Sequence, residues 1–117
     1  MTCVTGGFYD EKCYFEISGH ACSENDGSYG MPSEVGEGDP LACAAVSVLV
    51  MTALEKVRAL DSDGAFISSY VTVEPGYACF DLETRAEYAE ELRHAFDTLM
   101  LGFELLEENY PDCVSVA

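Results

Sequence analysis

The sequence predicts an α+β fold in which two main helices pack on a mostly antiparallel or mixed sheet. Three observations support this class. Short segments alternate apolar and polar residues with a period of two, two longer segments carry apolar residues at helical spacing, and turn-forming residues separate them in the order ββαββα, with a final β. At 117 residues, the chain is expected to form a single domain with one core.

The expected strands are short and are joined by recognisable turns. In the second strand, Cys13, Phe15 and Ile17 alternate with polar or amphipathic residues, as in a half-buried strand. The third and fourth strands form a hairpin around Glu74-Pro75-Gly76, a combination typical of a type II turn. The five expected strands are Met1–Tyr9, Lys12–Ser18, Ala65–Val73, Tyr77–Leu82 and Cys113–Val116.

The first helix is predicted to begin with Asp39 as N-cap and Pro40 at the first helical position, and to end near Leu60. It is apolar almost all round over 41–54, so it requires cover on more than one side, from the sheet, the second helix or a partner subunit.

The second helix is predicted to begin at Thr84, which forms a capping-box pattern with Glu87, and to end before Pro111. Its apolar stripe comprises Tyr88, Leu92, Phe96, Leu99, Phe103 and Leu106.

The segment between the second strand and the first helix has no apolar period and is rich in glycine. We expect a mobile loop at residues 21–38, because long irregular segments in small domains are often functional. The residues of this loop expected to contact a substrate are Gly27, Tyr29, Gly30, Gly36 and Gly38.

The composition limits the partners. Five Lys and Arg against 22 Asp and Glu give a net charge of −17, which disfavours nucleic acid and anionic membranes and favours a basic partner, although the charge could serve solubility alone. No secretion signal and no membrane-spanning stretch are recognised, so a soluble cytoplasmic protein is expected. The six cysteines are accordingly expected to be free thiols, most of them small apolar residues of the strands.

Cys43 and His20 could form a catalytic pair. Cys43 lies in the predicted first turn of the helix, where the helix dipole favours a thiolate, and a neighbouring histidine could take the thiol proton. His20 is the available histidine, since His94 lies in the middle of the second helix. Ser47, one turn after Cys43, and Asp39 could support the pair.

Spacing alone favours a plainer interpretation, in which Cys43 is a small core residue, His20 a loop residue, Ser47 bonded to its own helix and Asp39 only a cap. A metal site formed by His20, Cys22 and Cys43 is a weaker alternative, because it lacks a fourth ligand at a sensible spacing. No metal and no cofactor are expected.

The segments FEISGHA, a glycine-rich loop, GD and CAAVSVL, together with the closing LLEENYPDCVSV, closely resemble the ribosomal-processing cysteine protease family Prp over nearly the whole chain. The resemblance implies a small α/β sandwich that forms homodimers. It also implies a catalytic dyad of His20 and Cys43, with Asp39 and Ser47 at the matching supporting positions. The loop is longer than the family pattern and is expected to cover the substrate.

The resemblance further implies an endopeptidase that removes a short N-terminal extension from a bacterial large-subunit ribosomal protein, number twenty-seven, cutting after paired phenylalanines. A basic ribosomal substrate agrees with the charge of −17. The alternative is a non-enzymatic acidic module that binds a basic ribosomal or assembly protein through the same groove.

Overall fold

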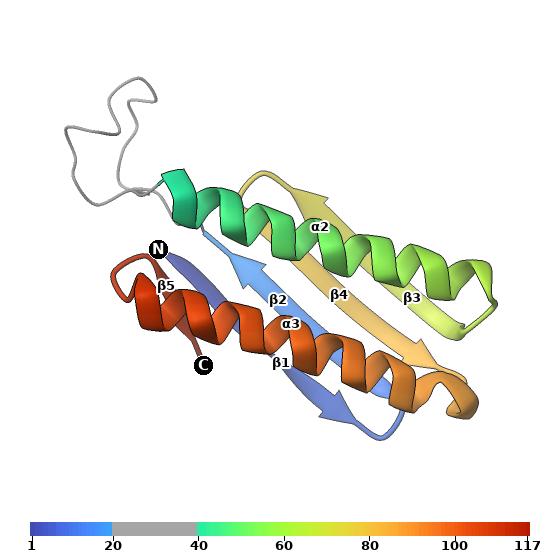
Figure 1. Ribbon diagram of the computed structural model, residues 1–117. Coiled ribbons are helices and arrows are strands. Elements are labelled where there is room, and N and C mark those ends of the chain that lie inside the picture. Colours follow the sequence, from blue (N-terminus) through green and yellow to red (C-terminus); the bar gives the residue numbers. More distant parts are fainter. Residues whose placement is uncertain (20–39) are drawn as a thin grey trace.

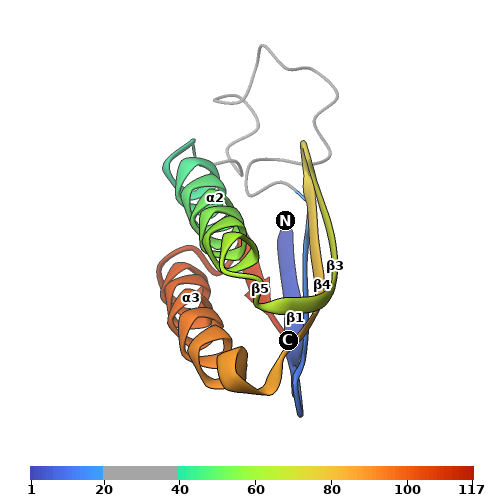
Figure 2. The same cartoon turned by 90° about the vertical axis from the view of Figure 1, so that its right-hand side faces the viewer.

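The chain forms two layers, a five-stranded sheet and a pair of helices that lie on one face of it (Figures 1 and 2). The structure is a computed structural model and describes residues 1–19 and 40–117. The sheet has the order β3-β4-β2-β1-β5, antiparallel throughout except for the parallel pair β1 and β5. Its strands are β1 (Thr2–Tyr9), β2 (Lys12–Ser18), β3 (Phe66–Glu74), β4 (Tyr77–Thr84) and β5 (Val114–Val116).

This arrangement confirms the predicted α+β class, with a mixed sheet and two main helices. The bounds of β2 are those expected, and its inward side chains Cys13, Phe15 and Ile17 are all buried. The hairpin turn is also confirmed: Gly76 has a φ of 77°, the positive value that the third residue of a type II turn requires. The remaining strands differ from the expected bounds by one or two residues.

The helices are α2 (Pro40–Ser62) and α3 (Ala89–Asn109). Within α3, the predicted stripe is confirmed, since Leu92, Phe96, Leu99 and Phe103 are buried. Phe96 lies at the centre of the core, with ring centroids 4.9 Å from Phe15 and 5.8 Å from Phe80. The inward face of α2 is formed by Ala42, Val46, Val50, Ala53, Val57 and Leu60.

The predicted capping box at Thr84 is wrong. Strand β4 continues through Thr84, which is fully buried and hydrogen-bonds through its backbone N–H to the carbonyl oxygen of Glu11 at 2.9 Å. A 3₁₀ turn, η1 (Ala86–Tyr88), then leads into α3 with Arg85 as its N-cap residue. Burial of the alternate residues of β4 therefore outweighs the local capping preference.

The outer side of α2 remains apolar and exposed. Leu41, Val48 and Met51 are 71%, 63% and 49% exposed. By length and composition alone, α2 is apolar enough to cross a membrane, contrary to the expectation of no such stretch, and 28% of its most apolar window is buried inside the protein. Core helices of soluble proteins meet the same criterion, and α2 covers the sheet over its whole length (Figure 1).

Candidate active site

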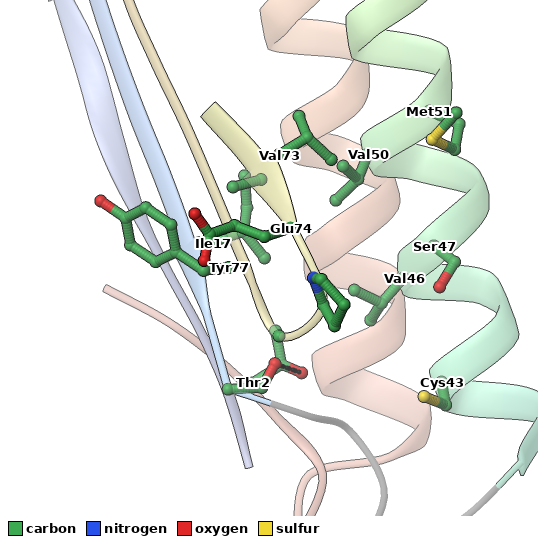
Figure 3. A pocket seen from close by; sticks show the side chains of 14 residues that line it. Thr2, Ile17, Cys43, Val46, Ser47, Val50, Met51, Val73, Glu74 and Tyr77 are labelled. Atoms are coloured by element: carbon green, nitrogen blue, oxygen red, sulfur yellow. Dashed lines mark hydrogen bonds between the residues drawn. The ribbon is translucent and has the colours of Figure 1, made fainter. Parts of the chain in front are cut away.

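The first turn of α2 places Cys43 at the edge of the core. Ala42 and Val46, on either side of it in sequence, are buried against the sheet. Because successive helical residues are about 100° apart, the Cys43 side chain lies at the border of this buried face, and the residue is half-buried. Ser47 follows one turn later on the same side of the helix and is exposed (Figure 3).

Cys43 and Ser47 open onto a cleft of about 350 Å³ between α2 and the β3–β4 hairpin (Figure 3). The sulfur of Cys43 points toward this space. The other walls come from the start of β1, the end of β2 and the hairpin turn, so four segments distant in sequence meet here. The apolar side chains of the lining are Ile17, Val46, Val50, Met51, Val73 and Ala78.

Gly19, the residue directly before His20, also lines the cleft and is held there by hydrogen bonds. Its backbone N–H donates to the carbonyl oxygen of Gly76 at 2.8 Å. Its own carbonyl oxygen accepts a bond from the Thr2 hydroxyl at 3.2 Å. Gly19 has a φ of 88°, and a Cβ at this position would overlap the carbonyl oxygen of Met1. Only glycine therefore fits here without strain.

The structure thus brings Cys43, Ser47 and the chain leading to His20 to one cleft. His20 and Asp39 themselves lie outside the described residues, as do the expected loop over 21–38 and its residues Gly27, Tyr29, Gly30, Gly36 and Gly38. The expected roles of these residues remain predictions.

The other described cysteines differ from Cys43 in their surroundings. Cys13 is buried in the core; burial, and to a lesser degree the charge of Asp81, raises the pKa of its thiol to about 12, despite the opposing effect of Arg93. Such a thiol stays protonated and inert. Cys3 and Cys79 belong to the side of the sheet away from the helices. No disulfide joins any two of the five cysteines that the structure describes.

Residues 1–19 and 40–117 contain no group of three His, Cys, Asp or Glu side chains that could hold a metal. The alternative site of His20, Cys22 and Cys43 includes two residues beyond these ranges, so this observation does not address it.

The sequence did not reveal two walls of the cleft. Thr2 was expected only as part of the first strand, and Pro75 only as part of a turn. Their place beside Cys43 follows from the strand order, which positions the β3–β4 hairpin and the start of β1 at the same end of the sheet as the start of α2. The Glu74-Pro75-Gly76 sequence predicts a turn but does not indicate that this turn lies beside Cys43.

The half-buried thiol in the first turn of a helix, open to an apolar cleft on a two-layer α+β fold, is an arrangement that suits a cysteine protease. Residues 5–115 match the family model of the cysteine protease Prp. The chain therefore belongs to the Prp family of cysteine proteases.

Solved structures share the fold over nearly the whole chain. One is SMU.848 from Streptococcus mutans, with 24% identity, a TM-score of 0.63 and coverage of 99% of this chain and 91% of that one. Two are of the essential ribosomal processing protease Prp from S. aureus. Its complex with a substrate peptide has 18% identity, a TM-score of 0.63 and coverage of 100% and 98%. Its complex with a covalently linked product peptide has 19% identity, a TM-score of 0.61 and coverage of 99% of this chain and 97% of that one. No curated protein sequence matches this chain significantly.

Proposed function

We propose that the chain is an endopeptidase that uses Cys43 as nucleophile and His20 as general base and acid. The observation that supports this most is that Gly19 and Cys43 line the same cleft. Gly19 is the residue that directly precedes His20 in the sequence. The match of residues 5–115 to the cysteine protease Prp family adds to this.

In the proposed mechanism, His20 takes the thiol proton as the Cys43 sulfur attacks the carbonyl carbon of the scissile peptide bond. The tetrahedral intermediate then expels the amine, which receives the proton from His20, and leaves a thioester on Cys43. A water molecule, deprotonated by His20, hydrolyses this thioester and restores the thiol. Asp39 and Ser47 support the pair, Asp39 from the helix start and Ser47 from the next turn of α2.

We further propose that the substrate is the precursor of bacterial large-subunit ribosomal protein twenty-seven, cut after paired phenylalanines. The similar S. aureus structures are of a ribosomal processing protease, and one of them contains a substrate peptide. The apolar walls of the cleft suit apolar side chains, and its volume of about 350 Å³ is sufficient for a large one. The net charge of −17 suits a basic ribosomal substrate in the cytoplasm.

A homodimer also belongs to this proposal. The helical layer exposes Leu101 and Leu105 of α3, 60% and 59% exposed, in addition to the apolar residues on the outer side of α2. Several large apolar side chains exposed on one layer favour association. Substituting aspartate for Val48, which is 63% exposed and is not among the residues that line the cleft, should convert a sedimenting dimer to monomer.

The decisive experiment compares the wild-type chain with Cys43→Ala on a synthetic leader peptide containing paired phenylalanines. The wild type should cut after the second phenylalanine, and the variant should bind the peptide without cutting it. Cys79→Ala, which removes a thiol on the far side of the sheet, is the matched control and should cut normally. A wild-type chain that binds the peptide but leaves it intact would instead support a non-enzymatic acidic binding module.

A further inference from the structure

The face of the sheet away from the helices is open. Figure 2 shows both helices on one side, and no residue of 1–19 or 40–117 packs on the other. We call this surface, formed by the outward side chains of β1 to β4, the open sheet face. By the alternation of each strand, its central members are Tyr9, Lys12, Tyr14, Glu16, Tyr70, Thr72, Glu74, Tyr77, Cys79, Asp81 and Glu83.

The register places aromatic and acidic side chains next to one another across this face. Asp81 lies opposite Tyr14 on β2 and opposite Tyr70 on β3. Two residues further along β2, Glu16 lies opposite Cys79 of β4, and Tyr77 lies diagonally to Glu16. Side chains at such positions are within contact distance.

These neighbours interact. A hydrogen bond with Cys79 is the largest cause that raises the pKa of Tyr14, followed by desolvation and the negative charge of its neighbours, Glu16 among them. The pKa of Tyr77 is raised mainly by a hydrogen bond with Glu16 and next by one with Cys79. The two tyrosines therefore stay neutral at cellular pH.

The open sheet face carries net negative charge. Glu16, Glu74, Asp81 and Glu83 face outward, against one cation, Lys12. The two ion pairs found between described residues, Lys56–Glu91 and Arg58–Glu55, both lie in the helical layer, so neither neutralises these carboxylates. The face is thus acidic and rich in tyrosine, a combination that attracts arginine and lysine by charge and stacks their side chains on aromatic rings.

The same charge argues against other occupants. A second copy that docked through the same face would place two acidic faces against each other, unlike a dimer formed through the helical layer, and nucleic acid or an anionic membrane would be repelled. A basic protein segment is the remaining class of partner.

The open sheet face is continuous with the cleft. Glu74 and Tyr77 line the cleft at the hairpin turn, yet the Glu74 carboxylate and the Tyr77 ring lie on the side of the strands away from α2 (Figure 3). A polypeptide held in the cleft can therefore pass the turn and continue over the face. Strand β4 has eight residues and offers a surface roughly 26 Å long.

We propose that the open sheet face docks an arginine- and lysine-rich segment of the substrate protein, separate from the residues that are cut. The inference rests on the proposed function, because it assigns the basic segment to the protein that the enzyme cleaves. The cleft would then select the cleavage site, and the open sheet face would select the protein that carries it.

The first test measures binding of a labelled peptide, in which arginine alternates with serine, to the Cys43→Ala chain. The pair Asp81→Asn and Glu83→Gln should weaken binding about tenfold, because two exposed charge contacts are lost. The matched control, Asp97→Asn with Glu104→Gln on the exposed side of α3, removes the same charge from the opposite layer and should change binding by less than about twofold. Equal weakening by both pairs would show attraction by net charge alone and overturn the proposal.

The second test compares cleavage of a short leader peptide and of the whole precursor by the active chain. With Asp81→Asn and Glu83→Gln, KM should rise for the precursor and stay unchanged for the short peptide. Equal kinetics on both substrates would overturn docking while the proposed function stands. A wild type that cuts neither substrate would overturn the proposed function and the docking role together. If the wild type sediments as a dimer that these two substitutions dissociate, the occupant is a second copy, and the proposal is wrong.

Discussion

Replacing Gly19 by alanine tests whether the hydrogen-bonded backbone at the end of β2 positions His20, the proposed general base. The substitution adds one Cβ at a residue with a φ of 88°, where that atom would overlap the carbonyl oxygen of Met1. Gly64→Ala is the matched control. Gly64 has a similar φ of 76°, but a Cβ there meets no atom within 4 Å, and the residue lies beyond the far end of α2.

The two variants should share one cost and differ in another. An L-residue in the left-handed region loses about 1–2 kcal/mol, which both variants should show as a lower free energy of unfolding. Gly19→Ala must also move the backbone by roughly 1 Å to restore an ordinary contact with Met1. That shift lengthens the hydrogen bonds to Thr2 and Gly76 and is transmitted to the next residue, His20. A displacement of about 1 Å of a catalytic group costs about a hundredfold in rate.

The assay is kcat/KM on the leader peptide, with urea unfolding of each variant in parallel. Gly64→Ala should cut at nearly the wild-type rate despite its lower stability, and Gly19→Ala should be folded but about a hundredfold slower. A folded Gly19→Ala enzyme with wild-type kcat/KM would refute the argument that this backbone positions the histidine. Equal losses in both variants would point to stability as the common cause.

Three further outcomes are expected. His20→Ala should lower kcat by orders of magnitude, whereas His94→Ala, on the exposed side of α3, should leave it unchanged; equal losses would contradict the dyad. The Cys13 thiol has a pKa of about 12 in the folded chain against 9.0 in the unfolded chain, so its stabilising contribution is fully present below pH 9 and is lost as the pH rises toward 12. The difference in unfolding free energy between the wild type and Cys13→Ala, measured by urea unfolding, should therefore shrink by about 1.4 kcal/mol per pH unit above pH 9. A difference that stays constant with pH would contradict the assignment. Phe96→Ala should cost about 3–5 kcal/mol of unfolding free energy in urea unfolding, and a loss below about 1 kcal/mol would contradict its place at the centre of the core.

The fold was predictable wherever one periodicity dominated a segment. Strand β2 alternates buried and exposed residues along its whole length, and Pro40 begins α2 at the expected position. The error at Thr84 shows the limit of this reasoning. Thr84 and Glu87 satisfy the local capping pattern, but the burial of Phe80, Leu82 and Thr84 extends the strand instead. A local motif cannot report that its first residue is needed by a neighbouring strand.

The candidate site was predictable only in its chemistry. A thiol in the first turn of a helix can be recognised from sequence, and so can a histidine at the end of a strand. The contributions of Thr2 and the β3–β4 turn depend on which strands are neighbours. The hydrogen bond between Gly19 and Gly76 joins residues more than fifty positions apart, and no local pattern marks either residue as a partner of the other.

The parallel pairing of β5 with β1 links the cleft to the strand that comes last in the sequence among the described elements. Thr2, whose hydroxyl holds Gly19, donates its backbone N–H to the carbonyl oxygen of Cys113 at 2.8 Å and pairs with Val114. Among the described elements, translation delivers β5 last, after Cys43 and both helices have left the ribosome. The cleft therefore lacks part of its support until β5 has emerged and docked beside β1.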